Sequence, residues 1–288
     1  MKIALYGRTV TDANRIGMET LLNMLRQRST PQLFCYSAFY DCLCGAGIAL
    51  PDATLFASAD ELPDDVRLLI SLGGDGTYLE AITLVCGRDI PVAGVNFGRM
   101  GFLTNATEHF VDLLDGNYNI QFRTLLNMRC SAMPADFHPY ALNEITLQRT
   151  SASMLEVNVK LNNTMLPTYW ADGLLVATAT GTTAYSLSLG GPVVLPESNV
   201  LIISPIAPHN LNVRPLIVPG DSQIEMTFNS RGGSALVTAD NRSFEAPNGV
   251  AISLSKAPFA LKCASVKNNF IDALREKLMW GEDKRNKF

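Results

Sequence analysis

An apolar run over residues 66–72 leads directly into Gly-Gly-Asp-Gly-Thr at residues 73–77. A buried strand that ends in three glycines, with a helical pattern over residues 78–86 behind it, predicts a strand–loop–helix unit. Glycines in such a loop let backbone N–H groups approach an anion closely, and the helix adds the positive end of its dipole. A carboxylate in a phosphate-binding loop would repel the phosphate. We therefore expect Asp75 to take a proton from a hydroxyl or to hold a cation.

The first part of the chain alternates between strand and helix patterns, which is typical of a parallel sheet covered by helices. In the helix predicted over residues 12–28, we expect Ile16, Leu21, Leu22 and Leu25 to share the buried side. Strands are predicted at 2–7, 66–72 and 90–95, a second helix at 105–115, and residues 32–40 are an ambiguous apolar run.

The pattern changes near residue 118, after which helical periodicity nearly disappears. Residues 154–161 alternate between apolar and polar side chains, and residues 224–228 repeat this alternation. Short strands separated by Gly, Pro and Asn turns indicate a β-sandwich-like domain. The last segment is helical again and ends in a basic tail. The predicted fold class is α/β: a Rossmann-like parallel-sheet domain (residues 1–120 plus 266–288) and an all-β domain (residues 121–265), with the final helix returning to the first domain.

Composition excludes several classes of function. Of the 288 residues, 47% are hydrophobic and the net charge is −4, so we expect no nucleic-acid-binding surface, which would be basic. The sequence contains no uninterrupted run of 18 apolar residues, so we expect no membrane span. The N-terminus shows no signal-peptide pattern. The six cysteines are scattered without metal-binding spacing, which favours reduced thiols in a cytoplasmic protein.

Three further motifs carry side-chain or backbone groups that could bind a ligand. Three glycines in residues 94–101 follow another strand, so a second backbone loop is expected at the same sheet edge, where open parallel sheets bind ligands. The Asn143-Glu144 pair can read an adenine edge or ribose hydroxyls through paired donors and acceptors. Residues 170–192 contain a loop rich in hydroxyls and glycine that can bind a phosphate or an amide. Each of these motifs alone is also compatible with an ordinary turn.

Together the motifs resemble the NAD kinase family over nearly the whole chain. The Gly-Gly-Asp-Gly-Thr block by itself is shared with lipid and sphingoid kinases. The Asn-Glu pair and the block Thr-Thr-Ala-Tyr-Ser at residues 182–186 narrow the resemblance to NAD kinases. The matching segments are 73–77, 94–102, 143–144, 172–192, 205–209, 214–216 and 274–278.

This resemblance implies transfer of the γ-phosphoryl group of ATP, with a divalent cation such as Mg²⁺, to the 2′-hydroxyl of the adenosine ribose of NAD. It implies that Asp75 is the proton acceptor; its rival role is to hold the cation, and no other metal ligand is assigned. It also implies a homodimer or homotetramer in which part of each dinucleotide site crosses a subunit boundary. The implied binding residues are Gly74, Gly76, Phe102, Asn143, Glu144, Asp172, Thr180, Thr183, Ala184, Tyr185, Ser186, Ser188 and Arg242.

The chain departs from the family pattern at three places. Leu103 stands where many relatives have Tyr, and Ala171 replaces a common Gly. Asp240-Asn241-Arg242 replaces a pattern such as Asp-Gly-Gln, so Arg242 is assigned either to a phosphate or to no ligand. A lipid kinase that shares the glycine block and a dinucleotide-binding sensor without turnover are the alternative functions. The range of phosphoryl donors, acceptance of NADH and feedback by NADP are left open.

Overall fold

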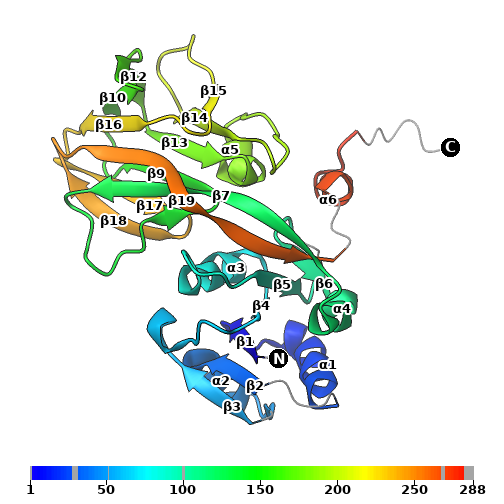
Figure 1. The fold of residues 1–288 in the computed structure, drawn as a ribbon. Helices are drawn as coiled ribbons and strands as arrows, with labels where there is room; N and C mark the ends of the chain where they lie inside the picture. The colour runs from blue at the N-terminus through cyan, green and yellow to red at the C-terminus, as the bar shows by residue number, and fades with distance from the viewer. Residues whose placement is uncertain (1, 28–31, 51, 99–100, 267–269, 282–288) are drawn as a thin grey trace. The chain divides into compact units, whose positions relative to one another are not determined.

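The structure is a computed structural model that describes residues 2–27, 32–50, 52–98, 101–266 and 270–281. Part of the second glycine loop (residues 99–100) and the basic tail (residues 282–288) lie outside the described residues. The chain forms two compact units (Figure 1). Unit 1 comprises Met1–Phe122 and Lys262–Phe288, and unit 2 comprises Arg123–Leu261.

Unit 1 is built on a parallel sheet with the strand order β3-β2-β1-β4-β5-β6. Every residue of the central strand β4 is buried, which explains its uninterrupted apolar sequence. The strands are β1 (Lys2–Gly7), β2 (Gln32–Tyr36), β3 (Ala53–Phe56), β4 (Leu68–Leu72), β5 (Val92–Asn96) and β6 (Thr104–Ala106). The helices are α1 (Asp12–Arg26), α2 (Ser37–Gly45), α3 (Asp75–Ala81), α4 (Phe110–Asp115) and α6 (Phe270–Leu278), with short 3₁₀ helices at Ala59–Glu61, Ile82–Leu84 and Thr107–His109.

The register of unit 1 brings its strand-ending loops together. Gly7 of β1 pairs with Leu72 of β4, and Leu72 pairs with Val95 of β5. Because these strands are parallel, the loops that follow them leave the sheet at one edge. The prediction that the two glycine-rich loops share a sheet edge is therefore confirmed for the described residues.

Two local predictions in unit 1 differ from the structure. Ile16 was expected on the buried side of α1, but 77% of its surface is exposed, and Met18 is buried with Leu21, Leu22 and Leu25 instead. The helix predicted over residues 105–115 is present as a 3₁₀ helix over residues 107–109 followed by α4, but it begins later than predicted, because residues 104–106 pair with β5 as strand β6. Strand pairing overrides the local helical pattern at that point.

Unit 2 consists of antiparallel strands in two layers (Figure 1). The first layer has the order β15-β14-β13-β9-β17-β18. Its strands are β9 (Glu144–Arg149), β13 (Gly173–Thr178), β14 (Val200–Ile206), β15 (Leu216–Pro219), β17 (Ser234–Ala239) and β18 (Arg242–Pro247). The second layer contains β7 (Asn119–Cys130), β8 (Tyr140–Ala141), β10 (Leu155–Leu161), β11 (Thr164–Met165), β12 (Tyr169–Ala171), β16 (Ile224–Asn229) and β19 (Ile252–Ser265).

One apolar core joins the two layers of unit 2. Val157 and Met226 from the second layer and Leu147 and Val176 from the first are fully buried in the same cluster. The alternation in residues 154–161 has this cause, since every second side chain of β10 points into the core. The antiparallel β domain predicted from the sequence is confirmed, and so is the final helix, α6, which belongs to unit 1. None of the described helices has the length and apolar character needed to cross a membrane.

Candidate active site

The Gly73–Thr77 loop of unit 1 places Asp75 at the first position of α3. Gly74 is the N-cap residue of this helix, and the helix follows β4 after only two residues. The Asp75 carboxylate accepts hydrogen bonds from the backbone N–H groups of Phe102 (3.1 Å) and Leu103 (3.4 Å). It also accepts one from the Thr104 hydroxyl at 3.3 Å. Asp75 is therefore fixed by the second glycine-rich loop, with a third of its side-chain surface still exposed.

Gly101 allows this contact between the two loops. A Cβ atom at residue 101 would collide with Oδ1 of Asp75 and with Oγ1 of Thr104. The Gly101 N–H donates to Oγ1 of Thr104 at 2.9 Å, which orients the hydroxyl that meets Asp75. Gly76, in contrast, has no described atom within 4 Å of the position a Cβ would take. Its backbone is thus accessible to a ligand on that side.

Phe102 is the predicted ligand-lining aromatic of unit 1, and it contacts the last helix. Its ring lies 6.0 Å from that of Phe270, and the Lys277 ammonium is 4.4 Å from its centroid. Lys277 is also 3.6 Å from Oδ2 of Asp75. The sequence pattern matched residues 274–278 to the family but assigned no role to Lys277, because only the fold brings α6 against this loop.

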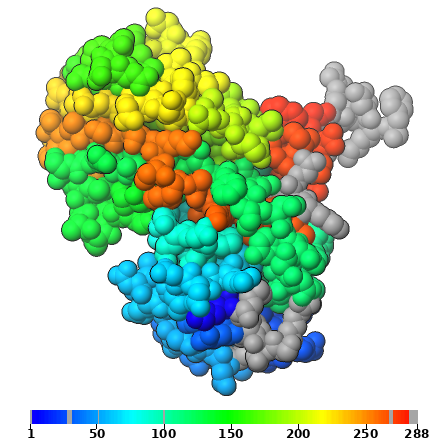
Figure 2. All heavy atoms as spheres, viewed as in Figure 1, coloured from blue at the N-terminus to red at the C-terminus, as the bar shows by residue number. Residues whose placement is uncertain are grey.

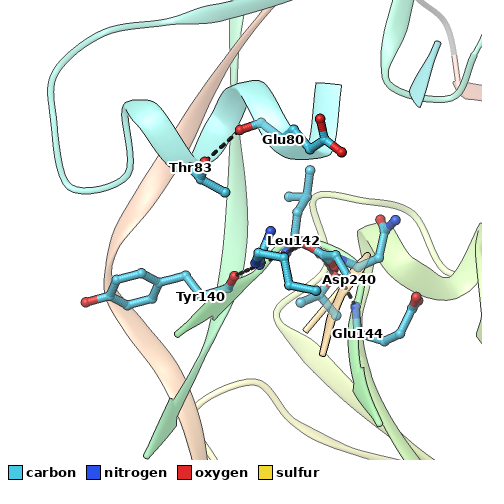
Figure 3. Close-up of polar contacts among 9 residues, drawn as sticks. Glu80, Thr83, Tyr140, Leu142, Glu144 and Asp240 are labelled. Atoms are coloured by element: carbon cyan, nitrogen blue, oxygen red, sulfur yellow. Dashed lines mark hydrogen bonds and ion pairs between the residues drawn. The ribbon is translucent and has the colours of Figure 1, made fainter. Parts of the chain in front are cut away.

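Asn143 and Glu144 of unit 2 are held by Asp240, a residue that lies in the turn between β17 and β18. The fully buried Asp240 carboxylate accepts N–H bonds from Leu142 (2.9 Å), Asn143 (2.8 Å) and Glu144 (3.2 Å). Figure 3 shows Asp240 with Leu142 and Glu144 at this point. The Asp240 N–H in turn donates to the Glu144 carbonyl at 2.9 Å. In the sequence, Asp240 is notable only as part of a departure from the family pattern, whereas in the structure it shapes the Asn-Glu turn.

The Glu144 carboxyl is buried close to this second acid. Burial, and then the charge of Asp240, raise the pKa of Glu144 to about 8, against a smaller opposing effect of the Tyr185 N–H. Burial also raises the pKa of Asp240, although its three N–H bonds and Arg242 oppose that shift. Glu144 is therefore a neutral hydrogen-bond donor at pH values where an exposed glutamate is ionised.

Replacing Glu144 with Gln is expected to stabilise the protein at alkaline pH. The folded state retains a proton that the unfolded state releases, so the wild type loses stability as the pH rises from about 5 to 8. Glutamine does not titrate, so the variant gains about 3 to 5 kcal/mol relative to wild type over this range, at about 1.4 kcal/mol per pKa unit. Urea unfolding at pH 5.5 and 9 measures this difference. The exposed Glu245→Gln is the control, and an E144Q profile parallel to wild type would contradict the prediction.

The hydroxyl-rich loop predicted from residues 170–192 meets the Asn-Glu pair. It forms a 3₁₀ helix, Thr180–Thr183, and a short helix α5 (Tyr185–Ser188). A Cβ atom at Gly181 would collide with the backbone of Asn143, and the Thr178 N–H donates to the Asn143 carbonyl at 2.9 Å. The two motifs, more than 30 positions apart in sequence, therefore form one cluster in unit 2.

Several predicted binding residues in this cluster present unused polar atoms. Oε2 of Glu144, Oγ1 of Thr180 and Oγ of Ser186 are buried and have no hydrogen-bond partner among the described residues. Buried polar groups are rarely left unpaired, so each indicates a place for a ligand or water. Thr183, in contrast, donates to the Thr180 carbonyl at 3.4 Å. Ala184 caps α5, while Tyr185 and Ser188 are its first and last residues, so the whole predicted set Thr180–Ser188 lies on this loop.

Asp172 is not part of this cluster. It precedes β13, whereas Thr180 follows β13, and six residues of strand separate them by about 20 Å. Asp172 forms an ion pair with Arg149 at 2.8 Å, on the wall of a pocket of about 760 Å³ that Trp170 and His209 also line. Within one chain the structure therefore separates two parts of the predicted dinucleotide site.

The guanidinium of Arg242 contacts other residues of unit 2. Its guanidinium donates to the Tyr140 carbonyl at 2.6 Å and lies 3.9 Å from Oδ2 of Asp240. Burial, and to a smaller extent the charge of Arg242, lower the pKa of His138 to about 4. Arg242 thus supports the turn that contains Asp240, and the role in binding a phosphate stays a prediction.

Comparisons with known proteins identify the family of this chain. Residues 18–119 match the family described as ATP-NAD kinase N-terminal domain, and residues 142–266 match ATP-NAD kinase C-terminal domain. The NAD kinase of Flavobacterium psychrophilum is 37% identical over 99% of this chain and 100% of its own length. That of Cytophaga hutchinsonii is 39% identical over the same shares.

Solved structures share the fold. An NAD kinase from Archaeoglobus fulgidus in complex with ATP superposes with a TM-score of 0.70, 27% identity, and coverage of 98% of each chain. Yeast NADH kinase complexed with NADH has a TM-score of 0.85 at 22% identity, and covers 100% of this chain and 90% of its own. With both family domains matched in order and relatives above 30% identity over the full length, the chain belongs to the NAD kinase family.

Proposed function

We propose that this protein transfers the γ-phosphoryl group of ATP to the 2′-hydroxyl of the adenosine ribose of NAD and so makes NADP. The observation that carries the proposal is the Asp75 carboxylate, which is partly exposed and fixed between two glycine-rich loops. The ribose O2′ forms a bond to the γ-phosphorus, the bond from that phosphorus to the bridging oxygen breaks, and ADP leaves. The hydroxyl proton passes to Asp75. General-base assistance of this kind contributes about 10²- to 10⁴-fold.

The divalent cation in this proposal is Mg²⁺. Mg²⁺ prefers oxygen ligands and is commonly bound through one or two carboxylates together with substrate phosphates. Asp75 offers such oxygens, but Phe102, Leu103, Thr104 and Lys277 already engage them. The described residues contain no group of three or more His, Cys, Asp or Glu side chains that would hold a metal. When bound, the cation neutralises phosphate charge, and we assign it to the donor phosphates with Asp75 as its one candidate protein ligand.

We assign binding of the dinucleotide to the cluster in unit 2 and to three positions in unit 1. Asn143 and Glu144 would hold the adenosine half, since the unpaired Oε2 of Glu144 can bond a ribose hydroxyl or an adenine nitrogen. The hydroxyls of Thr180 and Ser186 would bond the remaining polar groups of NAD. Phe102 and the accessible backbone of Gly76 complete the set in unit 1. Gly74, as the N-cap of α3, would contribute its backbone to the phosphates.

The domain boundaries proposed from the sequence carry these roles. Residues 1–120 with 266–288 would form the nucleotide-binding domain with the Gly73–Thr77 loop, and residues 121–265 would form the domain for NAD binding and self-association.

Exposed apolar side chains in unit 2 support self-association into a homodimer or homotetramer: Trp170, Leu211 and Ile217 are exposed by 41, 86 and 49%. The yellow segment around β15 lies on the surface of this unit (Figure 2). The six cysteines, all among the described residues, are thiols rather than disulfides, which suits a cytoplasmic enzyme.

Because part of each dinucleotide site is expected to cross a subunit boundary, we propose that Asp172 completes the site of a neighbouring copy. Mixing two inactive variants tests this proposal. Asp75→Asn and Asp172→Asn chains are each expected to be nearly inactive. A hybrid dimer of the two variants has one intact site, which takes Asp75 from one chain and Asp172 from the other. Its second site carries both substitutions. Random mixing in equal amounts should recover about a quarter of wild-type activity. Tagged hybrids that form but show no recovery would place Asp172 outside the neighbour's site.

The deciding assay for the function is NADP formation from NAD and ATP–Mg²⁺ by the full chain. Turnover that depends on both substrates supports the proposal. NAD binding at micromolar concentration without turnover would favour a dinucleotide-binding sensor, and phosphorylation of diacylglycerol but not NAD would favour a lipid kinase. A matrix of ATP or polyphosphate against NAD or NADH then defines the donor and acceptor ranges.

A further inference from the structure

Lys277, on the last helix, forms an ion pair with the proposed base. Its ammonium lies 3.6 Å from Oδ2 of Asp75 and 4.4 Å from the centroid of the Phe102 ring. The lysine side chain is 23% exposed. Two contacts of different kinds, an ion pair and a cation–π contact, therefore fix its position.

The helix α6 is arranged to present this lysine to the loop. Phe270 and Lys277 are seven residues apart, which is two helical turns, so they share one face, and both contact Phe102. Ala273 and Leu274 are buried and anchor the helix. Asp272 and Arg275 form an exposed pair with each other at 3.9 Å, on a part of the helix that solvent reaches.

Placing a lysine here has a cost that a surface ion pair would not have. Burial lowers the pKa of Lys277, and the nearby Asp75 carboxylate opposes this shift. A group desolvated beside a specific charge partner at a ligand-binding loop is characteristic of functional sites. At 3.6 Å the contact is an ion pair longer than an ordinary hydrogen bond, so a lone pair of Oδ2 stays available for a substrate hydroxyl.

We propose that Lys277 is the positioning residue of the catalytic carboxylate: from its place on the Phe102 ring, it holds Asp75 oriented toward the acceptor hydroxyl. This inference rests on the proposed kinase function, since it concerns the same carboxylate. The Phe102 and Leu103 N–H groups and the Thr104 hydroxyl set the plane of the carboxylate, and the ammonium adds a full positive charge beside it. When Asp75 accepts the proton it becomes neutral, and the ammonium then faces the negative charge of the transferred phosphoryl group.

The test compares two substitutions of Lys277 in the full chain. Lys277→Met removes the charge but keeps the length of the apolar stem, and Lys277→Arg keeps the charge. We expect Lys277→Met to lower kcat for NADP formation about 10- to 100-fold, the size typical of losing a group that orients a reacting residue. The KM for NAD should change less than about threefold, because Lys277 acts through Asp75 rather than on the dinucleotide. Lys277→Arg should recover most of kcat.

A pH profile separates this role from a purely structural one. Among the described residues, Asp75 on α3 faces Lys277, and Asp272, Arg275 and Glu276 are charged residues of its own helix. The wild-type rate should fall at a pH below the ordinary lysine range, as the ammonium loses its proton. The Lys277→Arg variant should lack this alkaline fall, since guanidinium remains protonated.

Controls keep the inference distinct from the function on which it rests. Lys2→Met removes a lysine that pairs with Asp65 at 2.6 Å in the same unit, and it should leave kcat unchanged. If the wild type makes no NADP, the proposed function is wrong. If the wild type is active but Lys277→Met keeps kcat within about twofold, or loses kcat only in proportion to its thermal stability, then the role of Lys277 is wrong. Lys277→Gln serves as the second neutral variant if the Met variant does not fold.

Discussion

Replacing Asp75 with Asn is expected to lower kcat for NADP formation by about 10²- to 10⁴-fold, while the Kd for NAD changes less than about threefold. Asparagine is nearly the same size, so the loop that contains Gly101 can still close over residue 75. Its amide cannot accept the hydroxyl proton, and it carries no charge to pair with Lys277. Steady-state kinetics together with calorimetric titration of NAD separate the two effects.

The matched control for this experiment is Asp89→Asn. Asp89 is an exposed aspartate of unit 1 that pairs with Lys262, away from the glycine-rich loops. It should retain wild-type kcat and stability. If Asp75→Asn weakened NAD binding as much as it lowered turnover, the carboxylate would be a binding group rather than a base. Recovery of turnover by a higher Mg²⁺ concentration would instead favour the rival role of Asp75 as a cation ligand.

Replacing Asp240 with Ala is expected to destabilise unit 2 by about 3 kcal/mol or more and to weaken NAD binding at least about tenfold. Three backbone N–H groups, those of Leu142, Asn143 and Glu144, lose their acceptor in a buried place, and each unpaired group costs about 1 to 3 kcal/mol. The Asn143-Glu144 turn then has no fixed geometry. Urea unfolding and NAD titration measure the two effects.

Two variants bracket the effect of Asp240. Asp240→Asn keeps one acceptor oxygen and should lie between wild type and Asp240→Ala. Asp221→Ala removes an exposed aspartate from another turn of unit 2 and should be neutral. Wild-type stability and NAD affinity in Asp240→Ala would mean that the turn is held by β9 and β17 alone.

Local sequence patterns predicted much of the fold because burial of one or both faces of a strand leaves its mark in consecutive residues. The apolar run of β4 and the alternation of β10 each reflect which faces of a strand are buried, and that is written in consecutive residues. Such patterns fail at residues 104–106, which pair with β5 although the local pattern is helical. The exposure of Ile16 is not such a failure, because at 3.6 residues per turn residue 16 lies on the opposite side of α1 from Leu25.

The candidate site shows the same division. The sequence by itself determined which residue types are present: a carboxylate among glycines, an amide beside a carboxylate, and a run of hydroxyls, in an order that identifies the family. Only the tertiary structure decided their partners. Lys277 reaches Asp75 across about 200 positions of sequence, Asp240 reaches the Asn-Glu turn across about 100, and Asp172 is separated from Thr180 by the length of β13. The physical reason is that the charge and shape of a side chain are local properties. The groups that surround it, and with them its protonation and orientation, are set by strand register and helix packing over the whole fold.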